Sequence, residues 1–185
     1  MVFDNHTHTT ISNLRLLDCI NDPIQLIDKA IELGLAGIAI TDHEALCAHM
    51  DVNEYAKKLQ ETHPEFTVAL GDEIYLTDTR DKGQKYYHFI LIAKDAIGHR
   101  CLRELSTKAW LNSYYDRGME RVPLLKEELE SIYSRFRGHL IATTACLGGE
   151  LGTSVLNLID CENALDTINA QRYHNQIAVF LEYCL

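Results

Sequence analysis

The chain has 185 residues, 46% of them hydrophobic, and a formal net charge of -10. This length allows one domain with a sizeable core, and no stretch approaches the roughly 20 apolar residues that cross a membrane. The acidic excess argues against nucleic-acid binding over the whole surface. Residues 80–137 nevertheless hold 12 Lys and Arg against 8 Asp and Glu. This mildly basic segment in the middle of the chain could contact a phosphate backbone, although an ordinary mixed-charge surface explains the pattern as well.

The start of the chain has neither the basic segment nor the apolar core of a signal peptide. The six cysteines lie far apart, without a CxxC pair. They are therefore expected to be reduced thiols, which fits a cytoplasmic protein of bacterial type.

Short apolar runs alternate with helical patterns along the chain. Asp22 and Pro23 predict the start of a helix that Gly34 ends. Further helices are predicted at residues 46–60, 102–111, 124–133 and 155–173, and strands at residues 1–3, 36–40, 66–70, 87–93, 140–143 and 177–183. This alternation predicts an α/β fold whose parallel strands are joined by right-handed crossovers. Because α/β domains seldom end on a strand, we expect the chain to stop before the fold is complete.

Two histidines near the start, His6 and His8, are separated by one residue. Side chains alternate along a strand, so both rings point to the same side and can reach one small volume. Imidazole is the commonest neutral metal ligand, so the pair suggests a metal site. Taken alone, the pair fits two ordinary structural histidines equally well.

Other polar groups accompany the later apolar runs, where α/β proteins build their sites at the carboxyl ends of strands. Each has an ordinary alternative, such as a turn cap, an exposed acid, a core histidine or a buried thiol. Asp42 could orient His43 instead of binding a metal itself. Their coincidence with strand ends favours a shared site. These candidates are Asp18, Asp42, His43, Glu73, His88 and Cys146.

The segments that carry these residues resemble the polymerase and histidinol phosphatase (PHP) domain. More narrowly, they resemble the amino-terminal PHP domain of bacterial DNA polymerase III alpha subunits. Residues 91–102, 105–109 and 145–150 favour this polymerase branch, and the match covers residues 1–185 as one domain. The matching segments are His6-Thr7-His8, Leu17-Asp18, Ile40-Thr41-Asp42-His43, residues 71–75, residues 87–94 and residues 145–150.

The resemblance implies a distorted (β/α)7 barrel related to the TIM fold, truncated here before its last strands. It also implies up to three divalent metals, with Glu73 as the bridging carboxylate. Two further family ligands, an Asp and a His one residue apart on the last strand, have no counterpart here. The polymerase palm is also missing, so no DNA synthesis is expected from these residues. The implied ligands are His6, His8, Asp18, His43, Glu73, His88 and Cys146.

A mixed set of imidazole, carboxylate and thiolate suits Zn, Mn or Fe better than Ca, and Mg is possible. The resemblance implies metal-dependent phosphoester hydrolysis, with a DNA 3′ end as substrate and a 3′→5′ exonuclease of the proofreading type. Glu73, Asp42 and His43 would carry the catalytic roles, with Asp42 orienting His43. The implied partners are DNA and, in a whole polymerase, a proofreading subunit and the clamp. No membrane partner is expected.

Two other functions remain open. The chain could be a free-standing PHP phosphatase of a small phosphomonoester such as histidinol phosphate. It could also be a non-catalytic scaffold that docks a proofreading subunit. Lost metal ligands would be the mark of a scaffold, whereas the seven expected positions are intact here, which favours metal binding. Intact ligands do not establish turnover, because metals can be structural.

Overall fold

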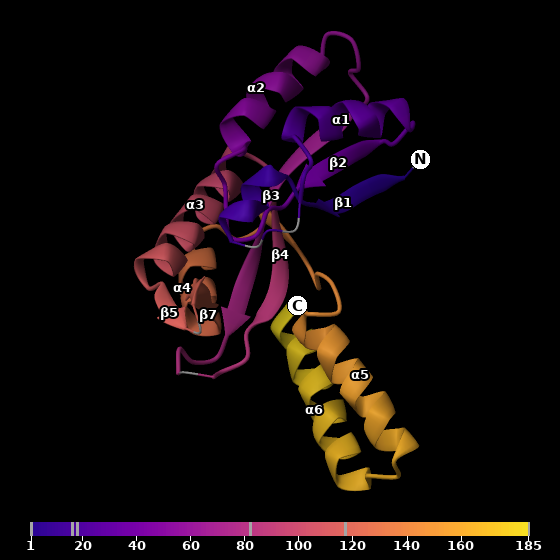
Figure 1. Cartoon of the computed structure of the whole chain (residues 1–185), viewed down its shortest axis with the longest axis vertical. Helices are drawn as coiled ribbons and strands as arrows, with labels where there is room; N and C mark the ends of the chain where they lie inside the picture. The colour runs from indigo at the N-terminus through magenta and orange to yellow at the C-terminus, as the bar shows by residue number, and fades with distance from the viewer. Residues whose placement is uncertain (1, 16, 18, 82, 117, 185) are drawn as a thin grey trace.

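The computed structural model describes residues 2–15, 17, 19–81, 83–116 and 118–184 (Figure 1). These residues form a mixed α/β fold with one six-stranded sheet and a separate two-stranded hairpin. In chain order the elements are β1 (Phe3–Thr7), the 3₁₀ helix η1 (Thr10–Leu14), α1 (Pro23–Glu32), β2 (Gly37–Ile40), α2 (His49–Leu59), β3 (Thr67–Thr77), β4 (Tyr87–Ala93), α3 (Ala96–Leu111), β5 (Tyr114–Asp116), β6 (Met119–Arg121), β7 (Pro123–Leu125), α4 (Lys126–Tyr133), β8 (Leu140–Thr143), α5 (Glu150–Asn163) and α6 (Thr167–Cys184).

Local sequence sets the helix boundaries. The Asp22 side chain accepts hydrogen bonds from the backbone N–H groups of Ile24 and Gln25, and Pro23 occupies the first turn of α1. Gly34 follows this helix with a φ of 72°, a conformation that glycine adopts without strain. The predicted start and end of this helix are therefore confirmed.

The main sheet is mixed, so the prediction of parallel strands throughout is wrong. Its order is β1-β2-β3-β4-β8, with β7 also pairing with β3. Strands β1, β2 and the first part of β3 are parallel, but β4 is antiparallel to both β3 and β8. The sequence suggested that the third strand ends at residue 70, whereas β3 continues to Thr77. Residues 78–86 are then too few for the crossover that a parallel β4 would need.

The predicted seven-stranded barrel is not found in the described part of the chain. There the sheet is open, with β1 and β8 at its two edges. No helix among the described residues is long and apolar enough to cross a membrane.

The last apolar run is a second correction, because residues 177–183 lie in α6 and not in a strand. The predicted helix at residues 155–173 is also divided, since α5 ends at Asn163 and α6 begins at Thr167. The two helices pack together as a hairpin that projects from the sheet (Figure 1). Phe180 is 4% exposed and packs edge-to-face on Phe89, whereas the neighbouring Val179 is 65% exposed. Such a difference in exposure between neighbouring residues is typical of an amphipathic helix, which buries one face and leaves the other in solvent.

Apolar side chains form two large clusters and one small one. The first lies between β3, β4, α3 and α4, and the second packs α1 and α2 against β2. The small cluster contains Ala39, Ile90 and Ile92 and is joined by Ala69 and Ala145. These residues alternate along their strands with members of the large clusters, so they lie on the opposite face of the sheet. The candidate site lies on this second face.

Helix α3 approaches β8 closely at Gly98. A Cβ atom at this position would lie 2.0 Å from the carbonyl oxygen of His139. Glycine is therefore required here by the close approach of two backbone segments.

Candidate metal centre

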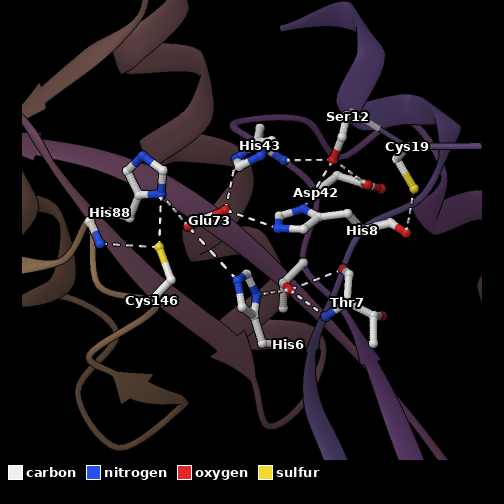
Figure 2. Close-up of polar contacts among 12 residues, drawn as sticks. His6, Thr7, His8, Ser12, Cys19, Asp42, His43, Glu73, His88 and Cys146 are labelled. Carbon is white, nitrogen blue, oxygen red and sulfur yellow. Dashed lines mark hydrogen bonds and ion pairs between the residues drawn. The ribbon is translucent and has the colours of Figure 1, made fainter. Parts of the chain in front are cut away.

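Glu73, near the middle of β3, is the centre of the candidate site (Figure 2). Its side chain is completely buried, and four imidazoles surround its carboxylate. Oε1 lies 2.7 Å from Nδ1 of His88 and 3.9 Å from Nε2 of His6. Oε2 lies 2.7 Å from Nδ1 of His43 and 3.2 Å from Nε2 of His8.

These contacts form two groups of potential metal ligands that share Glu73. His6 and His8 belong to one group, and His43 and His88 belong to the other. Within each group the ligand atoms all lie within 4.8 Å of one another. A carboxylate common to both groups has the position that a bridging ligand needs.

The mixed sheet brings these residues to one place. The parallel strands β1 and β2 end side by side, which places His6 and His8 beside His43. His43 forms an isolated parallel bridge with Glu73 in β3. Because β4 runs antiparallel to β3, His88 at its beginning lies near the carboxyl ends of β1 and β2. A parallel β4 would have carried His88 to the far edge of the sheet.

Cys146 reaches the same site from the turn after β8. Its Sγ lies 3.5 Å from Nδ1 of His88 and accepts a hydrogen bond from the backbone N–H of Gly148 at 3.3 Å. A Cβ at Gly149 would lie 2.3 Å from the carbonyl oxygen of Thr144, so the turn that holds the thiol is tight. Asp18, the remaining candidate ligand, lies outside the described residues.

The ring of His8 is held by Ser12. The Ser12 hydroxyl donates to Oδ1 of Asp42 at 2.7 Å, and its oxygen accepts from the backbone N–H of His43 at 3.2 Å. Nδ1 of His8 lies 3.1 Å from the same oxygen. Since the one hydroxyl hydrogen points to Asp42, this network assigns the remaining hydrogen to Nδ1 of His8. Nε2 of His8 is then the ring nitrogen that faces Glu73, at 3.2 Å from Oε2.

Thr41 holds His6 in a comparable way. Its hydroxyl donates to the carbonyl oxygen of Thr7 at 3.2 Å, and its oxygen lies 2.8 Å from Nδ1 of His6. Nε2 of His6 is therefore also turned toward Glu73. Metal-bound histidines commonly donate their second ring N–H to such a partner, which fixes the tautomer and ring orientation.

Asp42 is buried behind this network and does not face the cluster of ligand atoms directly. It accepts hydrogen bonds from the backbone N–H and the hydroxyl of Thr9, at 2.6 and 2.8 Å, in addition to the bond from Ser12. The sequence analysis predicted that Asp42 orients the side chain of His43. Through Ser12 it is connected both to the backbone of His43 and to the ring of His8.

The electrostatics of the site keep Glu73 ionised. Burial by itself would raise the pKa of Glu73, but the contacts of His43, His8 and His88 outweigh it and hold this pKa well below its usual range. Burial lowers the pKa of His6 despite the opposing charge of Glu73. An ionised carboxylate among imidazole nitrogens and a cysteine sulfur is a donor set that fits a transition metal or Zn.

Sequence reasoning missed several residues that shape the site, namely Thr9, Ser12, Thr41 and Tyr75. The Tyr75 ring lies 5.9 Å from the His43 ring and 5.1 Å from the His88 ring. Period-two alternation from Glu73 could have identified Tyr75 if the strand had been extended past residue 70. The hydroxyl residues carry no comparable signal, because Ser and Thr are common in every loop.

Asp72 and Glu44 are neighbours of the ligands in sequence but are fully buried away from water. Burial raises the pKa of both carboxyls, and the charge of Asp72 adds to the effect on Glu44. Asp72 follows the alternation of β3 and so points to the opposite face from Glu73. The two acids are therefore separate from the candidate centre.

Several of the basic residues between positions 80 and 137 are already paired with acids. Arg80 and Lys108 contact Glu128, Lys126 contacts Glu150, and Arg135 contacts Glu104. These pairs reduce the positive charge that the middle of the chain offers to a phosphate backbone.

Residues 4–183 match the PHP domain family. The chain is 39% identical over 97% of its length to the probable DNA polymerase YorL of Bacillus subtilis, and it spans 15% of that protein. It is 30% identical over 82% of its length to DNA polymerase III subunit alpha of Borreliella burgdorferi, of which it spans 12%. A solved protein from Bifidobacterium adolescentis, described as a metal-dependent phosphoesterase, is 21% identical with a TM-score of 0.39, over 59% of this chain and 34% of that one. The chain therefore belongs to the PHP domain family.

Proposed function

We propose that the chain is the PHP domain of a protein similar to DNA polymerase III alpha, and that it is a metal-dependent phosphoesterase. The proposed ligands are the four imidazoles around Glu73, Glu73 itself as the bridging group, the Cys146 thiol and Asp18. Zn, Mn or Fe suits this donor set best, and Mg is possible.

The orientation of His8 carries this proposal. Because Nδ1 of His8 lies 3.1 Å from the Ser12 oxygen, Nε2 of this ring faces the carboxylate of Glu73 at 3.2 Å. A ring nitrogen and a carboxylate oxygen this close share either a proton or a cation. Both oxygens of Glu73 are buried, and each faces two imidazole nitrogens within 3.9 Å. Buried and surrounded by nitrogen atoms, this carboxylate fits a cation.

Divalent ions held by these residues would supply a bound water of lowered pKa and positive charge opposite the attacking and leaving oxygens at phosphorus. The protein supplies the fixed geometry. The His8 and His43 rings stack at 4.1 Å, which restricts rotation of both. Asp42 is a positioning residue that acts through Ser12, and His43 holds one oxygen of Glu73. Burial of Glu73 keeps bulk water away from its carboxylate.

The proposed substrate is the 3′ end of a DNA strand, cleaved in the 3′→5′ direction as in proofreading. The support is that the relatives are named as DNA polymerases. The chain spans about 15% of the length of YorL, so polymerisation, a proofreading subunit and the clamp belong to a proposed longer protein. We propose that further strands of such a protein close the barrel and supply the missing Asp and His ligands.

The proposal has a two-stage test. First, the chain is loaded with Mn or Zn, dialysed, and its metal content is measured by mass spectrometry, with and without a chelator. Second, cleavage of a 5′-labelled single-stranded oligonucleotide is followed under single-turnover conditions, beside histidinol phosphate. We expect bound metal, and cleavage that a chelator abolishes. Absence of bound metal would reject the metal centre. Bound metal without any cleavage would reject the phosphoesterase and favour a non-catalytic scaffold. Cleavage of histidinol phosphate alone would indicate a small-molecule phosphatase.

A further inference from the structure

A surface cavity lies one aromatic ring away from the candidate metal ligands. The Tyr75 ring, which packs on His43 and His88, also contacts the Tyr86 ring edge-to-face at 5.7 Å. Tyr86 in turn lines a cavity of about 210 Å³ between the β3–β4 connection and the β5–β6 hairpin. The residues around this cavity are Gly83, Gln84, Lys85, Tyr86, Tyr114, Asp116 and Arg121.

The hairpin presents three of these residues, Tyr114, Asp116 and Arg121, on one face. Tyr114 in β5 and Arg121 in β6 are directly opposite each other in the antiparallel pair, so their side chains lie on the same side. Tyr115, the next residue, points to the other side and is 74% exposed. The cavity therefore receives one tyrosine from the hairpin, and the adjacent tyrosine is excluded from it.

The lining combines two aromatic rings with the cations of Lys85 and Arg121 and the carboxylate of Asp116. Within the lining, the Arg121 guanidinium lies 5.6 Å from the centre of the Tyr86 ring. Outside it, between the cavity and the candidate ligands, the Arg15 guanidinium lies 5.5 Å from the centre of the Tyr75 ring. Burial raises the pKa of Tyr86, so its ring stays neutral. Aromatic rings with interleaved arginines are the surfaces on which bases of single-stranded nucleic acids stack.

The size of the cavity limits its occupant. Cavities that hold a complete drug-sized ligand measure about 300–1,000 Å³, so this smaller one takes a single flat ring system. It is too small for a base pair. The lining holds two cations, Lys85 and Arg121, against one carboxylate, Asp116, so it offers net positive charge to a neighbouring phosphate. Gln84 offers an amide to the edge of a base.

We infer that the cavity formed by Tyr86, Tyr114 and Arg121 binds one base of a single-stranded DNA whose adjoining phosphate lies at the Glu73 cluster. This inference rests on the proposed function, since it takes the substrate to be a DNA strand. It assigns the recognition of a frayed, single-stranded end to the β5–β6 hairpin. The hairpin would select for an unpaired terminus by the size of the cavity.

The test measures binding without catalysis. A fluorescently labelled oligothymidylate is titrated with the chain in a chelator, and its anisotropy gives the dissociation constant. We expect Tyr114→Ala to weaken binding about 5- to 150-fold, the effect of losing one base–aromatic stack. Tyr115→Ala is the matched control and should bind as the unmodified chain does. Tyr114→Leu keeps apolar packing without the aromatic face, so it should lose binding while unfolding at the same temperature as Tyr115→Ala.

Four outcomes would overturn the inference. They are equal loss in the two alanine variants, no loss in either, no measurable binding by the unmodified chain, and equal binding of an oligonucleotide that lacks its bases. The chelator separates this inference from the proposed function. Binding that depends on Tyr114 without any cleavage in metal rejects the hydrolase alone. Chelator-sensitive cleavage with unchanged binding in Tyr114→Ala rejects the base cavity alone.

Discussion

The contact between His49 and His99 predicts that the chain loses stability as the pH falls below neutral. His49 begins α2, is 3% exposed, and has its Nδ1 3.0 Å from Nε2 of His99. Burial lowers the pKa of His49 to about 4, and the charge of His99 adds to the effect. In the unfolded chain His49 titrates near 6.5, so between these values the unfolded state binds a proton that the folded state does not.

The magnitude follows from this interval. Each pKa unit corresponds to about 1.36 kcal/mol, so the span from 6.5 to about 4 costs the folded state about 3 kcal/mol. This stability is fully present above pH 6.5 and is lost progressively down to about pH 4. Burial also lowers the pKa of His99 and of His6, which adds to the loss in the same direction.

The assay compares variants because other groups titrate in the same range. Urea unfolding is followed by the fluorescence of Trp110 from pH 7.5 to pH 4, in a chelator that removes any metal. We expect His49→Gln to flatten the pH dependence by about 3 kcal/mol relative to the unmodified chain. His63→Gln, at an exposed loop position, is the control and should change nothing. If all three proteins lose the same free energy of unfolding on acidification, the assignment to His49 is wrong.

Three further predictions concern the metal centre and the packing of the fold. Glu73→Gln should weaken metal binding by more than roughly 100-fold, which is the cost of losing a residue that only supports a ligand. Glu65→Gln, at an exposed position, is the control and should keep its metal in the same dialysis measurement. Asp42→Asn should reduce metal affinity about 10- to 100-fold while the circular dichroism spectrum stays normal. Unchanged affinity, or an equal loss of affinity in Asp51→Asn at an exposed position, would contradict the positioning role of Asp42. Gly98→Ala should lower the free energy of unfolding by about 3 kcal/mol in urea, because its Cβ would lie 2.0 Å from a carbonyl oxygen, and a loss below about 0.5 kcal/mol would show that α3 can move away.

Most helices and the central strands were predictable because their apolar periodicity is strong. The errors arose where buried polar residues interrupt that periodicity. Asp72 and Glu73 resemble a loop in the sequence, yet both are completely buried within the eleven-residue β3. Because the predicted strand ended at residue 70, enough residues remained before the next strand for a crossover, and the next strand was therefore predicted to be parallel. The run at residues 177–183 was ambiguous for another reason, since a short apolar segment fits a strand or one side of a helix equally well.

The residues that converge on the candidate site were predictable from the sequence, whereas the residues that support them were not. His6, His8, His43, Glu73, His88 and Cys146 converge, although His88 arrives by an antiparallel strand that the sequence did not indicate. Hydroxyl groups that orient rings depend on three-dimensional contacts between distant segments, as with Thr41 and His6, 35 residues apart. Single-sequence patterns do not encode such contacts.

Strand β3 pairs with β2 along its first half and with β4 and β7 along its second. Its side chains also reach both large apolar clusters, Val68 and Leu70 the cluster against β2, and Ile74 and Leu76 the cluster between β4 and α3. Loss of the pairing at one half of β3 therefore removes half of its partner strands and weakens the pairing at the other half. In native-state hydrogen exchange, the amides at the middle of β3 should be among the slowest, opening only with global unfolding.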